Sequence, residues 1–258
     1  MPKKELGQHW LRDRGILAAI ADDADITTND TVLEIGPGLG TLTSELLRRA
    51  GRVVAVEYDA DLARKLPGQF PGKSLTVHHQ DILQFDLSEL PAGYIVVANV
   101  PYYITSKIVS MLVTTHHKPR AAVLLVQKEV AQRIAASPGD MSLLALSAQV
   151  YAEASLGIEV PREYFTPPPK VDSQVVILKM RATPLVAPCG EKAFWRVAHA
   201  GFASKRKKLR SSIAAGLALS KPDAEALLIR ADIDPNARAE DLSITQWLHL
   251  AQQLSETV

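Results

Sequence analysis

The 258-residue sequence is poor in the residues that build covalent cross-links and aromatic cores. Its single cysteine, Cys189, excludes an internal disulfide and any cysteine-based metal cluster. Three Trp and five Phe leave Leu, Ile, Val and Ala to fill the core. No apolar run reaches the roughly 18–20 residues of a membrane span, and the N-terminus leads into no signal-peptide core. We therefore expect a soluble cytoplasmic protein without a membrane partner, and a monomer because nothing indicates an oligomer.

Short apolar runs alternate with amphipathic segments over the first two thirds of the chain. This alternation predicts an α/β fold whose strands form a parallel sheet. The predicted strands are 31–35, 53–56, 75–79, 94–98, 121–126 and 174–180, and the predicted helices are 11–25, 41–49, 60–66 and 105–115. Beyond residue 182 only helical patterns follow, at 191–203, 205–217, 222–231 and 243–254. We predict a Rossmann-like sheet with helices on both faces over 1–182, and a small all-helical domain over 183–258.

Polar residues and glycine follow four of these predicted strands directly. They are Gly36, Glu57, Asp81 and Asn99. In open parallel sheets ligands bind beyond the carboxyl ends of the strands, so these positions should meet in one site. Each residue alone also has an ordinary explanation, because glycines end strands and acidic residues cap helices. Their common register with the strands favours a shared site.

The segment Gly36-Pro37-Gly38-Leu39-Gly40 joins a strand to a helix and predicts a close approach of backbone to ligand. Its spacing differs from the dinucleotide fingerprint Gly-x-Gly-x-x-Gly, which holds a pyrophosphate. Glu57 lies 21 residues after Gly36, where a carboxylate can accept both ribose hydroxyls. Asp81 can accept an adenine amine, and Ile82 can cover the ring. This set predicts S-adenosylmethionine, which carries an adenosine but no phosphate.

The tetrapeptide Asn99-Val100-Pro101-Tyr102 ends a buried strand and predicts a grip on an exocyclic amino group. The Asn99 side-chain oxygen can accept one N–H, and the Pro101 carbonyl can accept the other. The Tyr102 ring can lie against the base that carries the amine. Alone the tetrapeptide also occurs as an ordinary turn. Together with the glycine segment it predicts amino-group methylation from S-adenosylmethionine.

Four sequence motifs, which follow one another along the chain, indicate a resemblance to a known protein family. They are Gly7-Gln8-His9-Trp10-Leu11, Glu34-Ile35-Gly36-Pro37-Gly38, Asn99-Val100-Pro101-Tyr102 and Phe165-Thr166-Pro167-Pro168-Pro169-Lys170-Val171-Asp172-Ser173. The chain resembles the ribosomal RNA adenine N6-dimethyltransferase family, class I methyltransferases, over nearly its whole length. The proline segment and the helical tail are specific to the branch that modifies the small ribosomal subunit.

The resemblance implies roles for individual residues. The residues expected to contact S-adenosylmethionine are His9, Leu11, Gly36, Glu57, Asp81 and Asn99. The target adenine would be gripped by Asn99, Pro101 and Tyr102 and covered by Phe165. Core packing remains an alternative for Tyr102 and Phe165, and a surface location for His9. Three positions depart from the family's usual residues: Trp10 replaces Phe, Val100 replaces Leu, and Tyr103 replaces Asn.

The uneven distribution of charge along the chain agrees with the RNA substrate that the resemblance implies. Residues 1–180 have a net charge of −2 and residues 181–258 one of +3. The excess lies in a basic run that comprises Lys205, Arg206, Lys207, Lys208 and Arg210. These side chains cannot all share one helical face, so some are simply solvated. We expect the others to contact phosphates of 16S ribosomal RNA, which positions the RNA without reading its sequence.

The leading hypothesis is dimethylation of N6 on two adjacent adenosines near the 3′ end of 16S ribosomal RNA, with a role in small-subunit biogenesis and no metal. The neighbouring residues His116 and His117 do not share a helical face, so we reject a metal site there. Three alternatives remain. They are a large-subunit ribosomal RNA methylase that confers macrolide resistance, a non-catalytic ribosome assembly factor, and a nicotinamide-dependent dehydrogenase.

Overall fold

The computed structural model describes residues 8–204 and 206–255, which form two compact units. The first unit contains the described residues up to Gln132 together with Glu153–Met180. The second contains Arg133–Ala152 and the residues from Arg181 onward. The predicted boundary after residue 182 lies near one limit of these units, while Arg133–Ala152 group with the tail. The assignment of methyl transfer to one domain and RNA binding to the other stays a prediction.

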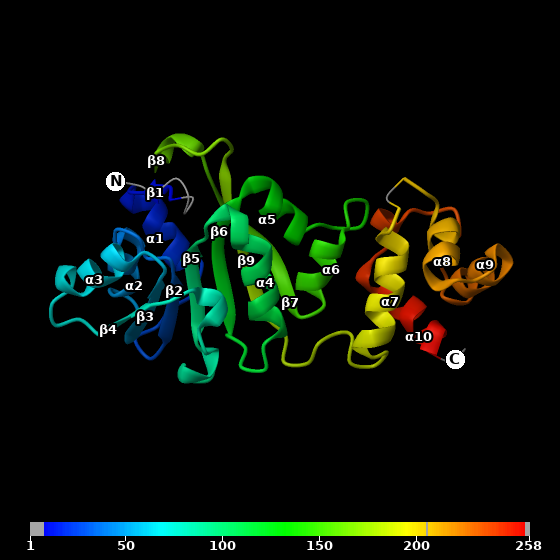
Figure 1. The fold of residues 1–258 in the computed structure, drawn as a ribbon, viewed down its shortest axis with the longest axis horizontal. Coiled ribbons are helices and arrows are strands. Elements are labelled where there is room, and N and C mark those ends of the chain that lie inside the picture. Colours follow the sequence, from blue (N-terminus) through cyan, green and yellow to red (C-terminus); the bar gives the residue numbers. More distant parts are fainter. Residues whose placement is uncertain (1–7, 205, 256–258) are drawn as a thin grey trace. The chain divides into compact units, whose positions relative to one another are not determined.

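A seven-stranded sheet forms the centre of the first unit, in the order β4-β3-β2-β5-β6-β9-β7 (Figure 1). The strands β2 to β6 pair in parallel, as predicted. The sheet is nevertheless mixed, because β9 pairs antiparallel with β6. A separate two-stranded sheet joins β1 to β8. The strands are β1 (Trp10–Leu11), β2 (Thr31–Ile35), β3 (Arg52–Glu57), β4 (Leu75–His79), β5 (Ile95–Asn99), β6 (Ala121–Gln127), β7 (Ala152–Val160), β8 (Phe165–Thr166) and β9 (Ser173–Met180).

The central strands owe their place to continuous runs of Val, Ile, Leu and Ala. In β5 the four residues Ile95 to Ala98 are fully buried, and so are the five residues Ala122 to Val126 of β6. Strands with apolar side chains on both faces must be covered on both, which is typical of parallel sheets in α/β proteins. The predicted Rossmann-like class is confirmed.

Ten α-helices and five 3₁₀ helices are present within the described residues. The α-helices are α1 (Arg14–Asp22), α2 (Thr41–Leu46), α3 (Ala60–Gln69), α4 (Thr105–Thr114), α5 (Lys128–Ile134), α6 (Leu143–Gln149), α7 (Glu191–Phe202), α8 (Leu209–Leu217), α9 (Lys221–Arg230) and α10 (Ile244–Ser255). The 3₁₀ helices are η2 (Ile82–Gln84), η3 (Leu87–Glu89), η4 (Tyr102–Ile104), η5 (Arg162–Tyr164) and η6 (Ala239–Asp241).

Four predicted helices had wrong bounds. The helix predicted over 11–25 spans only Arg14–Asp22, and the helix predicted over 41–49 ends at Leu46. The helix predicted over 205–217 begins only at Leu209, because Lys208 has an extended conformation and forms the N-cap of α8. The helix predicted to close at Pro67 continues to Gln69. Pro67 lies inside α3, where it removes one helical hydrogen bond, and the helix ends two residues after it. The elements α5, α6, β1, β7 and β8 were not predicted at all.

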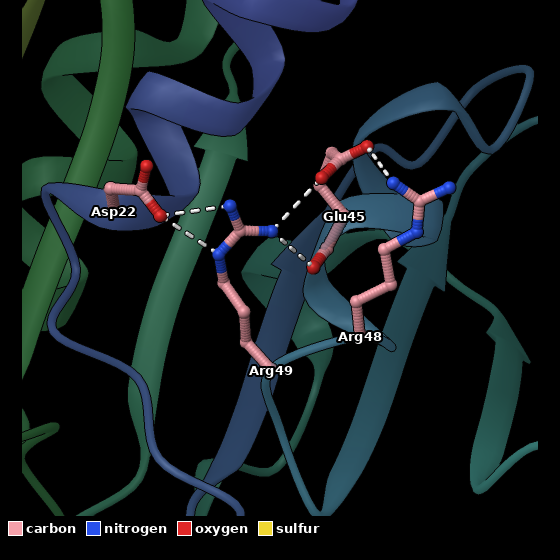
Figure 2. Close-up of polar contacts among 4 residues, drawn as sticks. All are labelled: Asp22, Glu45, Arg48 and Arg49. Carbon is pink, nitrogen blue, oxygen red and sulfur yellow. Dashed lines mark hydrogen bonds and ion pairs between the residues drawn. The ribbon is translucent and has the colours of Figure 1, made fainter.

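An ion-pair network ties α2 to α1 in the first unit. Figure 2 shows the Arg49 guanidinium between Asp22 of α1 and Glu45 of α2. Its Nη2 lies 2.8 Å from Asp22 Oδ1, and its Nη1 lies 2.9 Å from Glu45 Oε2. Arg48 pairs with the other oxygen of Glu45 at 3.0 Å. Since the Glu45 side chain is only 7% exposed, these charges are less screened than those of a fully exposed pair. The network fixes the helix that follows the glycine segment.

Residues 8–204 and 206–255 contain neither a membrane-spanning helix nor a cluster of metal-binding side chains. None of the helices there has the length and apolarity needed to cross a bilayer. The same residues contain no group of three or more His, Cys, Asp or Glu side chains arranged to hold a metal ion.

Candidate functional site

A cavity of about 420 Å³ opens at the carboxyl ends of β2, β3 and β5. Its volume lies in the range of small-molecule sites. Nine of the ten residues predicted for the cofactor and the target base line it: His9, Leu11, Gly36, Glu57, Asp81, Ile82, Asn99, Pro101 and Tyr102. Phe165 is not among the lining residues. The structure therefore brings together residues that span some ninety positions of sequence.

The glycine segment presents backbone to this cavity. Gly36 has a φ of +67°, and a Cβ built on it would meet no atom within 4 Å. The position is therefore open toward the cavity and needs glycine for its backbone conformation. Gly40 is needed for packing, since a Cβ there would lie 2.8 Å from Leu66 Cδ1. Gly40 is also the N-cap of α2, so the loop delivers the chain into that helix.

Glu57 is the last residue of β3 and is only 6% exposed. Its Oε2 accepts the backbone N–H of Gly38 at 3.0 Å, and its Oε1 accepts that of Asp59 at 2.8 Å. Burial raises the pKa of this carboxyl, and both backbone hydrogen bonds oppose the rise. Each oxygen keeps a lone pair for a further donor. The carboxylate thus links the glycine segment to the strand beside it and can still accept hydroxyl groups.

Asp81 and Ile82 follow β4 at the same edge of the sheet. Asp81 Oδ1 accepts the backbone N–H of Leu83 at 3.0 Å and caps η2. Ile82 is buried and lines the cavity. The capping role of Asp81 uses one oxygen, which leaves Oδ2 for an amine.

Asn99 is the last residue of β5, and one hydrogen bond fixes the orientation of its side-chain amide. Its Nδ2 donates to the backbone carbonyl of His9 at 3.2 Å. No donor from the described part of the chain bonds to its Oδ1, so this oxygen is left to accept from a ligand. The Pro101 carbonyl accepts the N–H of Ile104 at 3.2 Å and retains a second lone pair. The two acceptors predicted for an amino group therefore lie two residues apart in sequence, and each has a lone pair left to accept from a ligand.

The Tyr102 ring stacks on the His9 ring with a centroid separation of 5.8 Å. The β1–β8 pair aligns Trp10 with Thr166 and Leu11 with Phe165. The N-terminal motif is therefore joined to the proline segment, a connection that two-residue strands are too short to reveal by periodicity. Phe165 is 3% exposed and packs in the hydrophobic core. Its role as a cover for the target base stays a prediction.

Several residues of the cavity were not predicted. Glu34 precedes the glycine segment, is 1% exposed, and lines the cavity. Its Oε2 accepts from Thr43 Oγ1 at 2.6 Å, while its Oε1 is buried with no partner in the described residues. Burial raises the pKa of Glu34 to about 8; the Thr43 hydrogen bonds oppose this shift and the charge of Glu57 adds to it. The sequence signal for a buried Glu34 was its position between apolar residues of a predicted strand.

Two exposed aromatic side chains flank the same cavity. Tyr58 follows Glu57 and is 60% exposed, and Tyr103 follows Tyr102 and is 63% exposed. Burial raises the pKa of the Tyr103 hydroxyl, and the charge of Asp81 raises it further. Tyr103 therefore lies near the carboxylate predicted to bind an adenine amine. Its departure from the family's usual Asn was the only hint.

The basic run lies in the second unit, in the connection between α7 and α8. Arg206, Lys207 and Lys208 are exposed, and Lys205 lies outside the described residues. Lys208 Nζ donates to Asn236 Oδ1 at 3.0 Å. Arg210 is half-buried in α8 and lies 3.9 Å from Glu225. Most of the described charges of the basic run therefore lie on the exposed loop that precedes α8.

Comparisons with known proteins agree with this geometry. The family model described as "Ribosomal RNA adenine dimethylase" matches residues 2–256. The ribosomal RNA small subunit methyltransferase A of Dehalococcoides mccartyi (strain CBDB1) is 44% identical over 252 residues, covering 96% of this chain and 87% of the relative.

Two solved structures are similar over nearly the whole chain. The 23S rRNA methyltransferase ErmE is 30% identical with a TM-score of 0.79, covering 95% of this chain and 99% of the other. A dimethyladenosine transferase from Plasmodium falciparum is 25% identical with a TM-score of 0.83, covering 96% and 98%. A cavity at the strand ends, lined by the Asn-x-Pro-Tyr segment, and a family match over residues 2–256 lead to one conclusion: this chain belongs to the ribosomal RNA adenine dimethylase family.

Proposed function

We propose that this enzyme dimethylates N6 of two adjacent adenosines near the 3′ end of 16S ribosomal RNA, with S-adenosylmethionine as the methyl donor. The observation that carries the proposal is the fixed Asn99 amide, whose Oδ1 has no partner among the described residues at the cavity that the glycine segment also lines. The named small-subunit relative at 44% identity supports the choice of RNA. A ribosomal substrate also agrees with the expected cytoplasmic location.

The residues present fit S-adenosylmethionine. Gly36 leaves room for close approach, because a Cβ there would meet nothing within 4 Å. Glu57 offers carboxylate lone pairs to ribose hydroxyls, and Asp81 offers one to the adenine amine. Ile82 supplies an apolar wall. When bound, S-adenosylmethionine supplies a methyl group on a sulfonium, which is already an activated donor.

The acceptor end prepares the adenine amine. The lone pair of an adenine N6 is delocalised into the ring and is a poor nucleophile. When its two N–H groups donate to Asn99 Oδ1 and the Pro101 carbonyl, the nitrogen becomes pyramidal and its lone pair is freed. The same two oxygens stabilise the positive charge that grows on nitrogen, and water takes the proton that the methylated amine then releases. The remaining contribution is alignment, which Tyr102 provides by holding the base in plane.

An adenine within a duplex cannot enter such a cavity, so the target base must be unpaired or flipped. Stacking on Tyr102 would stabilise the extruded base by roughly 1–3 kcal/mol. We propose that the exposed Arg206 and Lys207 contact phosphates of the small subunit. The residues up to 182 would then form the methyl-transferring domain and residues 183–258 the RNA-binding one, in an enzyme that acts as a monomer and needs no metal.

The test uses purified protein with methyl-labelled S-adenosylmethionine and unmethylated small ribosomal subunits, with large-subunit RNA in parallel. The RNA is digested and its nucleosides are identified by mass. We expect N6,N6-dimethyladenosine from the small subunit only. The absence of product from either RNA would contradict an enzymatic role and favour a non-catalytic assembly factor.

One observation favours a second candidate, a large-subunit methylase. The 23S rRNA methyltransferase ErmE covers 95% of this chain at 30% identity, so the fold and the Asn-x-Pro grip do not separate the two substrates. The proline segment and the helical tail favour the small subunit. Product from large-subunit RNA alone in the same assay, with macrolide tolerance in a sensitive host, would establish this candidate instead.

A further inference from the structure

The hydroxyl of Tyr102 is bound by a residue that has no role in the site so far. Tyr102 Oη lies 2.7 Å from Ser173 Oγ, and Ser173 is fully buried at the start of β9. Ser173 is the last residue of the proline segment Phe165–Ser173. Pro167, near the start of that segment, is connected to Tyr102 through His9. His9 Nδ1 lies 2.7 Å from the Pro167 carbonyl, and the His9 ring stacks on Tyr102 at an interplanar angle of 19°.

These contacts fix both the tilt and the rotation of the Tyr102 ring. A carbonyl can only accept, so Nδ1 of His9 is the donor to Pro167, and this bond sets the orientation of the imidazole. The imidazole covers one face of Tyr102, which leaves the other face for a base. The Ser173 hydroxyl bonds to Oη, the atom of Tyr102 farthest from the backbone. A small swing of the side chain about its Cα–Cβ bond moves this end of the ring most, and with it a stacked base.

We propose that Ser173 is a positioning residue for methyl transfer, which holds Tyr102 in the orientation that the target adenine stacks upon, with His9 as the second support. This inference rests on the proposed function of Tyr102. Ser173 acts through Tyr102 alone. Its backbone pairs with Gln127 of β6 whatever the side chain, so loss of the hydroxyl leaves the strand in place.

The experiment is a double-mutant cycle on methyl transfer to unmethylated small subunits. Ser173→Ala and Tyr102→Phe each remove one half of the same hydrogen bond. Each is expected to lower kcat about tenfold, with an unchanged Kd for S-adenosylmethionine and an unchanged KM for the subunit. The double variant is expected to be no slower than either single variant, because both remove one interaction.

Losses that multiply in the double variant, or a Ser173→Ala enzyme with wild-type kcat, would overturn the proposal. If Ser173→Ala fails to fold, Tyr102→Phe still removes the bond from the other side, and a wild-type kcat for it would overturn the proposal equally. Ser212→Ala is the matched control, since Ser212 is a buried serine of the second unit. Tyr102→Ala separates the two hypotheses: full activity would contradict the role of Tyr102 itself, whereas its loss beside an intact Ser173→Ala enzyme contradicts only the positioning role.

Discussion

The cavity residues and the basic run differ in how their side chains are held. Glu57 and Asn99 are both fixed by hydrogen bonds to backbone groups that come from other elements. Arg206 and Lys207 are exposed, and the side chain of Lys208 donates to Asn236 Oδ1. Chemistry on a single amine needs oxygens fixed to within about half an ångström. Attraction of a polyanion needs only charge, so mobile side chains suffice.

Asn99→Ala is expected to have the largest effect, because it removes an oxygen that must be held in a fixed position. Removal of Oδ1 leaves the amine with one acceptor, and we expect kcat to fall roughly 100- to 1,000-fold. The variant also loses the hydrogen bond to His9, which should cost about 1 kcal/mol of unfolding free energy. Methyl transfer and thermal melting are the measurements. Asn29→Ala, at an exposed loop asparagine, is the matched control and should behave as wild type.

Glu57→Gln should damage cofactor binding next. The amide keeps one acceptor oxygen but turns an N–H group toward a backbone donor, either that of Gly38 or that of Asp59. We expect the Kd for S-adenosylmethionine to rise roughly 10- to 100-fold, as measured by titration calorimetry. The exposed Glu89→Gln variant serves as control. An unchanged Kd in Glu57→Gln would remove Glu57 from the ribose site.

The double substitution Arg206→Ala with Lys207→Ala should weaken binding to small subunits about tenfold at moderate salt. The slope of log affinity against log salt should become shallower by about 1–2, since two phosphate contacts are lost. The Kd for S-adenosylmethionine should stay unchanged. Lys65→Ala with Lys73→Ala removes the same charge from exposed positions of the first unit and should leave the slope as in wild type. Equal slopes in all three proteins would show that the basic run is merely solvated.

A separate prediction concerns Glu34 and the dependence of folding stability on pH. The folded protein keeps a proton on Glu34 up to about pH 8, whereas an ordinary glutamate releases it near 4.5. Folding therefore takes up a proton between these values, and the free energy of unfolding falls as the pH rises through that window. Glu34→Gln removes this titration. Denaturant unfolding at pH 5 and pH 8 should show a smaller decline for the variant than for wild type, and equal declines would contradict a buried neutral Glu34.

Much of the first unit could be predicted because its strands are continuous apolar runs. The strands at Thr31–Ile35 and Leu75–His79 were predicted with the correct ends. The polar residues that follow those strands then converge by topology, since parallel strands end at one edge. This is why Gly36, Glu57, Asp81 and Asn99 line one cavity, whereas His9 and Leu11 were expected there only from the family resemblance.

The missed features depend on contacts that pattern cannot encode. The strands β1 and β8 have two residues each, too few for any periodicity, and form only because they pair with one another. The basic run has good helix-forming residues, but Lys208 is extended where the chain bonds to Pro235 and Ala237 through Arg210 and Leu209. The contact between Tyr102 and Ser173 joins residues 71 positions apart. Short-range sequence signals carry none of this information.

The most direct test of the central claim is a structure of the enzyme on an unmethylated small subunit with S-adenosylhomocysteine bound. We expect N6 of the target adenosine to lie about 3 Å from both Asn99 Oδ1 and the Pro101 carbonyl, with its base on the Tyr102 ring. A target base stacked elsewhere, or an N6 that donates to neither Asn99 Oδ1 nor the Pro101 carbonyl, would contradict this expectation.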